Sequence, residues 1–169
     1  MAPGNWLAFL RITVGLWFLA GLAAKVEPQV VSGWLPLLQP ADAWLTVFLD
    51  RLAEYAAGNP LVPYAMFLRE AVIPNGEVVA HSIIWAELAI GIGLTLGLLT
   101  RVAAGIGFLL SLNYLLASFW MGPSQQGFHL ILLACMVAFI GAGAGRKLGM
   151  DAWLTRLIWR GRSMPAVLA

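Results

Sequence analysis

Two ionisable residues lie inside long apolar stretches of the sequence. Glu87 lies in the stretch from Ile83 to Leu99, and Arg11 lies in the stretch from Trp6 to Ala24. A charged side chain at the centre of a bilayer costs roughly 2.5–3.5 kcal/mol even on a mild insertion scale, so it normally faces a partner or a water-filled cavity. Function is therefore to be sought first at Glu87, whose carboxyl group could carry protons, and at Arg11.

The composition predicts an integral membrane protein. The 169 residues are 61% hydrophobic and 11% charged, far below the roughly 25% charged residues of soluble domains. The net charge of +2 is too small to indicate nucleic-acid binding. The one cysteine, Cys135, excludes a disulfide and a cysteine-held iron–sulfur site within the sequence. We expect no metal, haem or flavin in this chain.

Four segments approach the roughly 20 residues that a membrane-spanning helix needs. They cover residues 6–25, 79–99, 102–120 and 128–144. Only Thr100 and Arg101 separate the second from the third, which predicts a tight antiparallel turn at the membrane surface. The predicted fold is an all-α membrane protein, a four-transmembrane-helix bundle forming a single domain over residues 1–169.

The distribution of charge predicts the orientation. Residues 145–169 form a basic tail with five Lys or Arg and a single acid, and Arg101 lies in the predicted turn. The long connection between the first two spans instead carries six acids and three bases. Because cytoplasmic loops are enriched in Lys and Arg, both termini are expected in the cytoplasm and the long connection outside.

The long connection contains an insert, residues 33–77, with two predicted amphipathic helices. The first begins at Asp42 and is stopped by Gly58, Asn59 and Pro60. The second covers residues 63–73 and is halted by Pro74. An apolar helix face outside the cytoplasm is expected to lie along the outer bilayer surface or to cap the bundle.

Small and polar residues recur at three- and four-residue steps on three spans, which predicts the faces that meet inside the bundle. These stripes are Arg11, Gly15, Phe18, Leu22 and Lys25 on the first span, His81, Ile84, Glu87, Gly91 and Thr95 on the second, and Gly105, Leu109, Asn113 and Leu116 on the third.

Helix geometry separates Glu87 from Arg11. Counting about 1.5 Å per residue from Arg101 places Glu87 about 21 Å above the cytoplasmic end and Arg11 only about 8 Å above it. Five polar residues collect in the outer half: Lys25, His81, Glu87, Asn113 and His129. Glu87 is expected to be protonated or shared between cations, and the pattern does not assign it to one partner.

For the polar residues other than Glu87, the alternative is a structural role. Arg11 could reach lipid phosphates, and Lys25 and the two histidines could anchor the outer interface. Asn113 could join two helices by a hydrogen bond.

The order of these residues resembles a known family. The first span runs from Arg11-Ile-Thr-Val-Gly15 to Lys25, the second has Glu87 followed by Gly91, Gly97 and Thr100-Arg101, and the fourth ends in Gly143-Ala-Gly145-Arg146-Lys147-Leu-Gly149-Met-Asp151-Ala152. This is similar to the DoxX family of small four-helix membrane proteins of bacteria and archaea, which includes the DoxD subunit of thiosulfate:quinone oxidoreductase. The resemblance implies a prokaryotic inner-membrane protein.

The resemblance also implies a redox role, in which this chain would be a membrane subunit offering a quinone site in the outer half of the bundle. The expected catalytic residues are Glu87, His129 and His81; the expected ligand-binding residues are Asn113, Lys25, Trp85, Tyr114 and Arg11. Its partners would be the lipid bilayer and a redox or other membrane-complex protein, which supplies the electrons. The alternatives are a non-catalytic accessory subunit and a small-molecule carrier.

Overall fold

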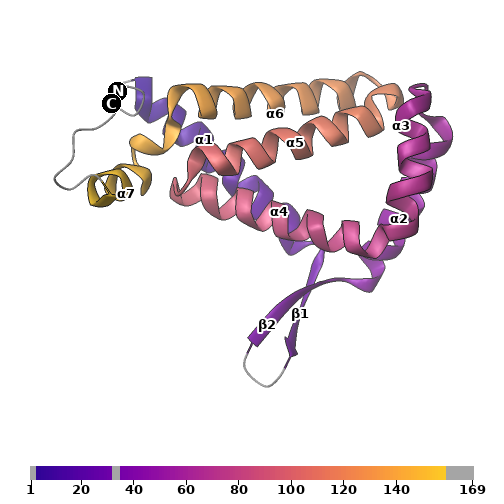
Figure 1. Cartoon of the computed structure of the whole chain (residues 1–169). Helices are drawn as coiled ribbons and strands as arrows, with labels where there is room; N and C mark the ends of the chain where they lie inside the picture. The colour runs from indigo at the N-terminus through magenta and orange to yellow at the C-terminus, as the bar shows by residue number, and fades with distance from the viewer. Residues whose placement is uncertain (1–2, 32–34, 159–169) are drawn as a thin grey trace.

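Four long helices run between the two ends of the molecule (Figure 1). The computed structural model describes residues 3–31 and 35–158. The helices are α1 (Pro3–Ala23), α4 (Gly76–Leu96), α5 (Thr100–Ser118) and α6 (Pro123–Ala142). Each begins and ends a few residues before the predicted span, and each belongs to a helical segment long and apolar enough to cross a membrane. The prediction of an all-α, four-helix membrane protein is confirmed.

Helix α1 packs against α4, α5 packs against α6, and α4 lies beside α5. Glycine permits the closest of these approaches. A Cβ atom on Gly15 would lie 2.5 Å from Thr95 Oγ1, and one on Gly91 would lie 2.6 Å from Leu19 Cδ2. Small residues at these positions therefore let the α1 and α4 backbones meet, as is usual between helices in lipid.

The interior face is as predicted on α1 and α4, but the prediction for α5 is wrong. Leu109 is 66% exposed and Asn113 is exposed, whereas Gly107 and Ser111 are buried. Helix α5 is apolar around most of its circumference, so its periodicity does not distinguish the side facing the bundle from the side facing lipid.

A cap stands across one end of the bundle (Figure 1). We use this name for α2 (Asp42–Gly58), α3 (Val62–Phe67) and the π-helical turn η1 (Leu68–Val72). The first predicted amphipathic helix corresponds to α2, and its buried residues Leu52 and Ala56 pack against Leu68 and Val72 of η1. Burial of these apolar side chains holds the cap together.

Asn59 joins the cap to the bundle. The side chain of Asn59 donates to the carbonyl of Leu116 near the end of α5, at 2.7 Å. The cap is therefore fixed to the end of a spanning helix by a specific hydrogen bond as well as by apolar packing.

Pro74 does not halt the second helix of the insert, contrary to prediction. The 3₁₀ turn η2 (Ile73–Asn75) takes Pro74 at its start, where the missing N–H is not needed, and leads directly into α4. One helical path therefore runs from Val62 to Leu96.

The first part of the connection forms a β-hairpin that was not predicted. Strands β1 (Val26–Val31) and β2 (Leu35–Pro40) pair antiparallel, with Val26 opposite Pro40. The hairpin returns the chain to its starting point, where the Ala41 N–H donates to the Lys25 carbonyl at 2.8 Å. Residues 33 and 34 of the predicted insert lie outside the described residues.

The opposite end of the bundle holds the α4–α5 turn, the 3₁₀ turn η4 (Ala144–Arg146) and α7 (Asp151–Ile158). The turn is Gly97–Leu99, and Thr100 and Arg101 belong to the first turn of α5, not to the turn as predicted. Gly97 ends α4 in the left-handed region, with φ of 65°. Residues 159–169 of the predicted basic tail lie outside the described residues.

Candidate functional site

Glu87 is buried in the fourth turn of α4, and only 3% of its surface is exposed. Both carboxylate oxygens accept from the Lys25 ammonium group, at 2.5 and 2.7 Å. The Tyr114 hydroxyl, from α5, donates to Oε1 at 3.3 Å. Three elements thus meet at one carboxylate, and the cation that the sequence left unassigned is Lys25.

Lys25 is held where α1 ends and the hairpin begins. Its ammonium group lies 5.7 Å from the centre of the Trp44 ring of α2, within the range of a cation–π interaction. The Lys25 side chain remains 21% exposed, whereas that of Glu87 is 5% exposed. The ion pair is therefore closed around the carboxylate and partly exposed on the side of Lys25.

His129 lies beside Tyr114, on α6. The two rings have centroids 5.8 Å apart, and Phe128 meets the histidine ring edge-on at 5.3 Å. His129 is 8% exposed, and its Nδ1 has no hydrogen-bond partner among the described residues. An unsatisfied buried nitrogen is costly in a protein interior, which makes His129 an available donor or acceptor next to the Glu87 cluster.

An enclosed cavity of about 180 Å³ lies between the cap, α4 and α5. Its polar lining comes from Tyr55, Tyr64, Asn113 and Tyr114, and the rest is apolar. The Tyr64 hydroxyl donates to the backbone carbonyl of Asn113 at 3.2 Å, which ties the cap to α5 at the cavity wall. Tyr114 therefore has two environments, since it lines the cavity and also bonds to Glu87.

The cavity adjoins a second space. A groove of about 330 Å³ runs between α4 and α5 on the outside of the bundle. The groove and the cavity share three lining residues, Val79, Ile83 and Asn113. The cavity beneath the cap thus lies next to a groove on the outside of the bundle, with these three residues between them.

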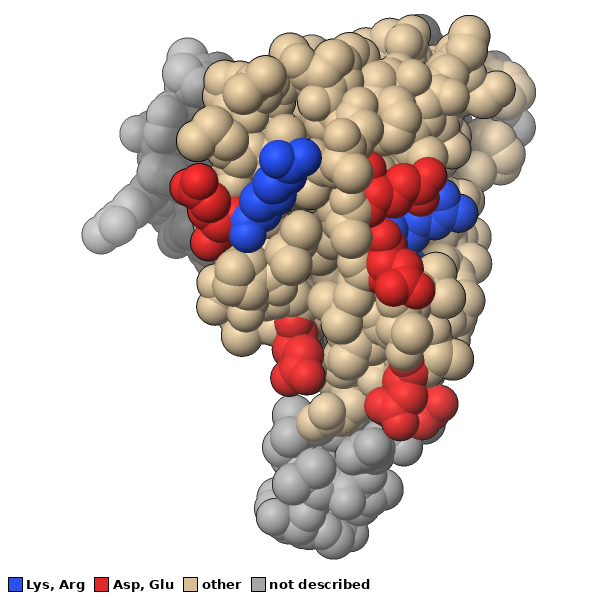
Figure 2. Space-filling view, turned by 90° about the vertical axis from the view of Figure 1, so that its right-hand side faces the viewer, with Lys and Arg blue, Asp and Glu red and all other residues tan. Residues whose placement is uncertain are grey.

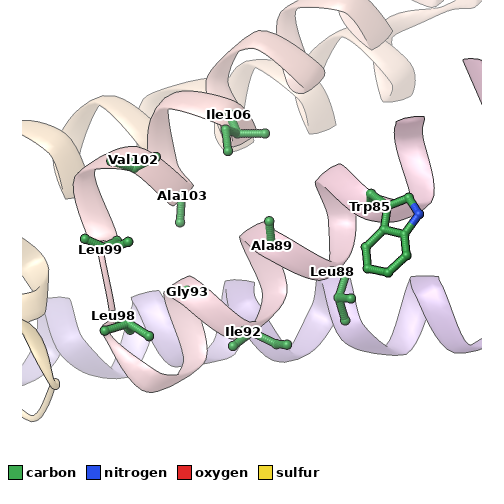
Figure 3. A pocket seen from close by; sticks show the side chains of 10 residues that line it. All are labelled: Trp85, Leu88, Ala89, Ile92, Gly93, Leu98, Leu99, Val102, Ala103 and Ile106. Carbon is green, nitrogen blue, oxygen red and sulfur yellow. The ribbon is translucent and has the colours of Figure 1, made fainter. Parts of the chain in front are cut away.

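Two predicted site residues lie away from this cluster. Trp85 is 47% exposed and lines a separate apolar groove of about 270 Å³ that runs along α4 and α5 toward the α4–α5 turn (Figure 3). His81 bonds within its own helix, with Nδ1 2.8 Å from the Glu77 carbonyl oxygen. Both are on α4, but neither points at Glu87.

Arg11 lies at the opposite end of the bundle and is fully buried. Its guanidinium donates to the carbonyls of Leu94, at 2.6 Å, and Leu148, at 3.0 Å. Arg11 thus holds the last turn of α4 against the segment before α7. It does not reach Glu87, and its burial excludes contact with lipid phosphates.

Asp151, for which the sequence suggested no role, completes this second charged site. Its carboxylate accepts from the N–H groups of Leu99, at 2.6 Å, and Thr100, at 3.0 Å, and so caps the start of α5. A Cβ atom on Gly145 would collide with the Asp151 carboxylate, and one on Gly97 would collide with Arg11. Close packing thus explains the glycines at positions 145 and 97.

The part of the chain that the structure describes contains no group of three or more His, Cys, Asp or Glu side chains able to hold a metal ion. The donor set of the candidate site is one carboxylate, one ammonium, one phenol and one imidazole. Such a set can bind and exchange protons with an oxygen-bearing ligand.

One protein-family model matches the chain, over residues 6–163, and it is described as DoxD, the TQO small subunit. No curated protein and no solved structure matches the chain. The match covers all four spanning helices, the cap and α7, and it refines the broader DoxX resemblance. The chain belongs to the DoxD family of membrane proteins.

Proposed function

We propose that this protein is the membrane subunit of a quinone-linked oxidoreductase and that it binds the quinone head group in the cavity beneath the cap. The observation that carries the proposal is that this cavity adjoins the groove on the outside of the bundle and shares Val79, Ile83 and Asn113 with it. A quinone has a polar ring and an apolar tail, and it reaches protein from within the bilayer. The groove offers such a molecule a lateral route to polar side chains.

The space fits a ligand of this kind. Cavities that bind small molecules are usually about 300–1,000 Å³, mostly apolar, with a few polar groups that fix orientation. The cavity and the groove together reach that range, and their polar groups collect at the inner end. The ring would lie against Asn113, Tyr64 and Tyr114, with the tail along α4 and α5.

A quinone accepts two electrons and two protons. The electrons would come from a partner subunit, since the residues of the candidate site have no redox chemistry suited to this task. The protein's own contribution would be to bind the ring, to exclude water beneath the cap and to hold proton-carrying groups beside it. His129, on the far side of Tyr114, would complete the polar surroundings.

The cap end would face away from the cytoplasm of a prokaryotic cell. Arg101, Arg146 and Lys147 lie at or near the α7 end, and the acids of the insert lie at the cap end. Through the positive-inside rule this distribution supports an orientation with α7 and the start of α1 on the cytoplasmic side of the inner membrane.

The test is binding of decylubiquinone to the purified protein in lipid nanodiscs, measured by equilibrium dialysis. Asn113→Trp fills the junction between cavity and groove and should raise the dissociation constant about tenfold or more. Leu130→Trp, at a 54% exposed position on α6 outside both spaces, is the matched control and should bind like the unaltered protein. Equal binding by the two variants would place the quinone elsewhere.

A second candidate function, that of an accessory subunit without a quinone site, is favoured by the surface of the cap end. Acidic side chains outnumber basic ones on this face (Figure 2). The exposed acids there are Glu27, Asp42, Asp50, Glu54, Glu70 and Glu77. Such a surface suits docking of a basic partner. Salt-sensitive copurification with another subunit, together with no decylubiquinone binding, would favour this function.

A further inference from the structure

We propose that Lys25, Glu87 and Tyr114 form a proton path that connects the cavity with water at the cap end of the molecule. The inference rests on the proposed function, because it assigns the source of one of the two protons used at the quinone. It adds a direction to the site: protons enter from the side of the cap.

The path is continuous in the structure. The Lys25 side chain is partly exposed, and its ammonium group donates to both oxygens of Glu87, at 2.5 and 2.7 Å. Glu87 is bonded in turn by the Tyr114 hydroxyl, at 3.3 Å, and Tyr114 lines the cavity. Since Glu87 is 3% exposed, protons reach it through these two side chains and not from bulk water.

The path closes toward the α7 end. Phe18, Ile90 and Leu94 are buried in the apolar core, and Ile90 and Leu94 lie about one and two helical turns beyond Glu87 along α4 in that direction. Beyond them Arg11 uses its hydrogen bonds on backbone carbonyls. An apolar layer is a poor medium for protons, so the groups near Glu87 exchange with the cap side.

Three other titratable groups lie around the path. The ring of His129, on α6, lies near that of Tyr114, and Tyr55 and Tyr64 of the cap share the cavity with Tyr114. Among the described residues, none of the three is hydrogen-bonded to Glu87. Tyr114 is thus the group that joins the carboxylate to the cavity.

Two electrons enter the quinone from the partner subunit, and its two oxygens take up two protons. Tyr114 gives its hydroxyl proton to the quinone oxygen facing it and becomes a phenolate. The Lys25 ammonium passes a proton to the Glu87 carboxylate, Glu87 passes that proton to the phenolate and is a carboxylate again, and Lys25 regains its proton from water. The path thus delivers one proton for each quinone reduced, and the oxygen on the opposite side of the ring takes the second from a water molecule that reaches it as the product leaves.

The test reduces bound decylubiquinone in nanodiscs with electrons from an electrode and a soluble mediator, so the natural donor is not needed. Tyr114→Phe keeps the ring and removes the hydroxyl. Its reduction rate at saturating quinone should fall about tenfold or more, and the rate should become more sensitive to replacement of H₂O by D₂O. Glu87→Gln should give the same result, and the double variant should be no slower than either single one.

Tyr64→Phe removes a different hydroxyl from the same cavity and is the comparison. It should weaken binding while leaving the ratio of rates in H₂O and D₂O at the value of the unaltered protein. Thermal unfolding of each variant identifies any loss of folding.

The outcomes separate the two proposals. Normal binding with equal reduction rates in the unaltered protein and Tyr114→Phe overturns the path and leaves the quinone site standing. No binding by the unaltered protein overturns the proposed function, and the path with it. Slower reduction with a larger solvent isotope effect, in Tyr114→Phe and Glu87→Gln alone, supports the path.

Discussion

The two buried charges of this bundle have opposite kinds of partner. Arg11, at the α7 end, donates to two backbone carbonyls and lies close to the carboxylate that caps α5. Glu87, at the cap end, is held by side chains and borders a cavity through Tyr114. A charged side chain bonded to helix ends, such as that of Arg11, has a structural role. A charged side chain bonded to ionisable groups beside a cavity, such as that of Glu87, can gain and lose a proton.

The difference has a physical basis in how helices end. The last carbonyls of α4 and the first N–H groups of α5 lack intrahelical partners, and each needs one when it is buried. The Met150 N–H donates to the Leu96 carbonyl, and the Asp151 N–H donates to that of Gly97. The α7 end thus uses its polar groups to complete helices, which leaves the cap end as the place for exchangeable protons.

Of the substitutions that test this difference between the two ends, Arg11→Leu is expected to lower the free energy of unfolding most. Its loss leaves the buried carbonyl of Leu94 and the partly buried carbonyl of Leu148 without a charged donor, so the free energy of unfolding should fall by about 4 kcal/mol. Denaturant unfolding in detergent measures it. Arg51→Leu, which breaks an exposed pair with Glu54, is the control and should cost about 0.5 kcal/mol or less. Similar small losses in both variants would show that Arg11 does not hold the α7 end.

Lys25→Met should lower the free energy of unfolding slightly less, by about 3 kcal/mol, because it leaves the Glu87 carboxylate buried without its cation. Replacing the carboxylate as well, in Lys25→Met with Glu87→Gln, should restore part of that stability, as judged by the same unfolding measurement. A single variant as stable as the unaltered protein would mean that the pair has no structural importance.

Asp151→Ala should lower the free energy of unfolding by about 1–2 kcal/mol, the usual effect of losing a helix cap. The matched control is Asp42→Ala, which removes an exposed acid from the first turn of α2 and should cost about 0.5 kcal/mol. Hydrogen exchange of the Leu99 and Thr100 amides should speed up in Asp151→Ala alone. Unchanged exchange would contradict the assignment of Asp151 as the cap of α5.

The smallest effect is expected from Trp44→Leu, which removes the ring beneath the Lys25 ammonium. The loss should be about 0.5–1 kcal/mol in unfolding measurements. Trp6→Leu, at a 61% exposed position of α1, serves for comparison. If both substitutions have the same effect, the contact between Trp44 and Lys25 adds nothing to the stability of the ion pair.

Spans and helix starts could be predicted because they depend on local composition. Apolar length defines the four helices, and the turn residues after Gly58 end α2 as expected. The heights of Glu87 and Arg11 followed from helical rise alone and correctly separated the two residues. These properties need no knowledge of what lies across the bundle.

The remaining features depend on tertiary contacts. The α5 cap comes from Asp151, about fifty positions away, and nothing local signals it. Pro74 is tolerated because it falls at the start of the 3₁₀ turn η2, where its missing N–H is not needed. The role of Tyr114 depends on the α5 face turned toward α4, which an evenly apolar sequence does not reveal.

The position of the Lys25–Glu87 pair has an electrical consequence. A charge that crosses the whole membrane gains or loses about 2.3 kcal/mol for each 100 mV of membrane potential. A proton that enters at Lys25 and stops in the cavity beneath the cap crosses only a small part of that field. Electrons delivered at the same end would cross equally little. Quinone reduction in this cavity would then be almost independent of membrane voltage, and any energy conserved would be captured when the quinol is oxidised at another enzyme.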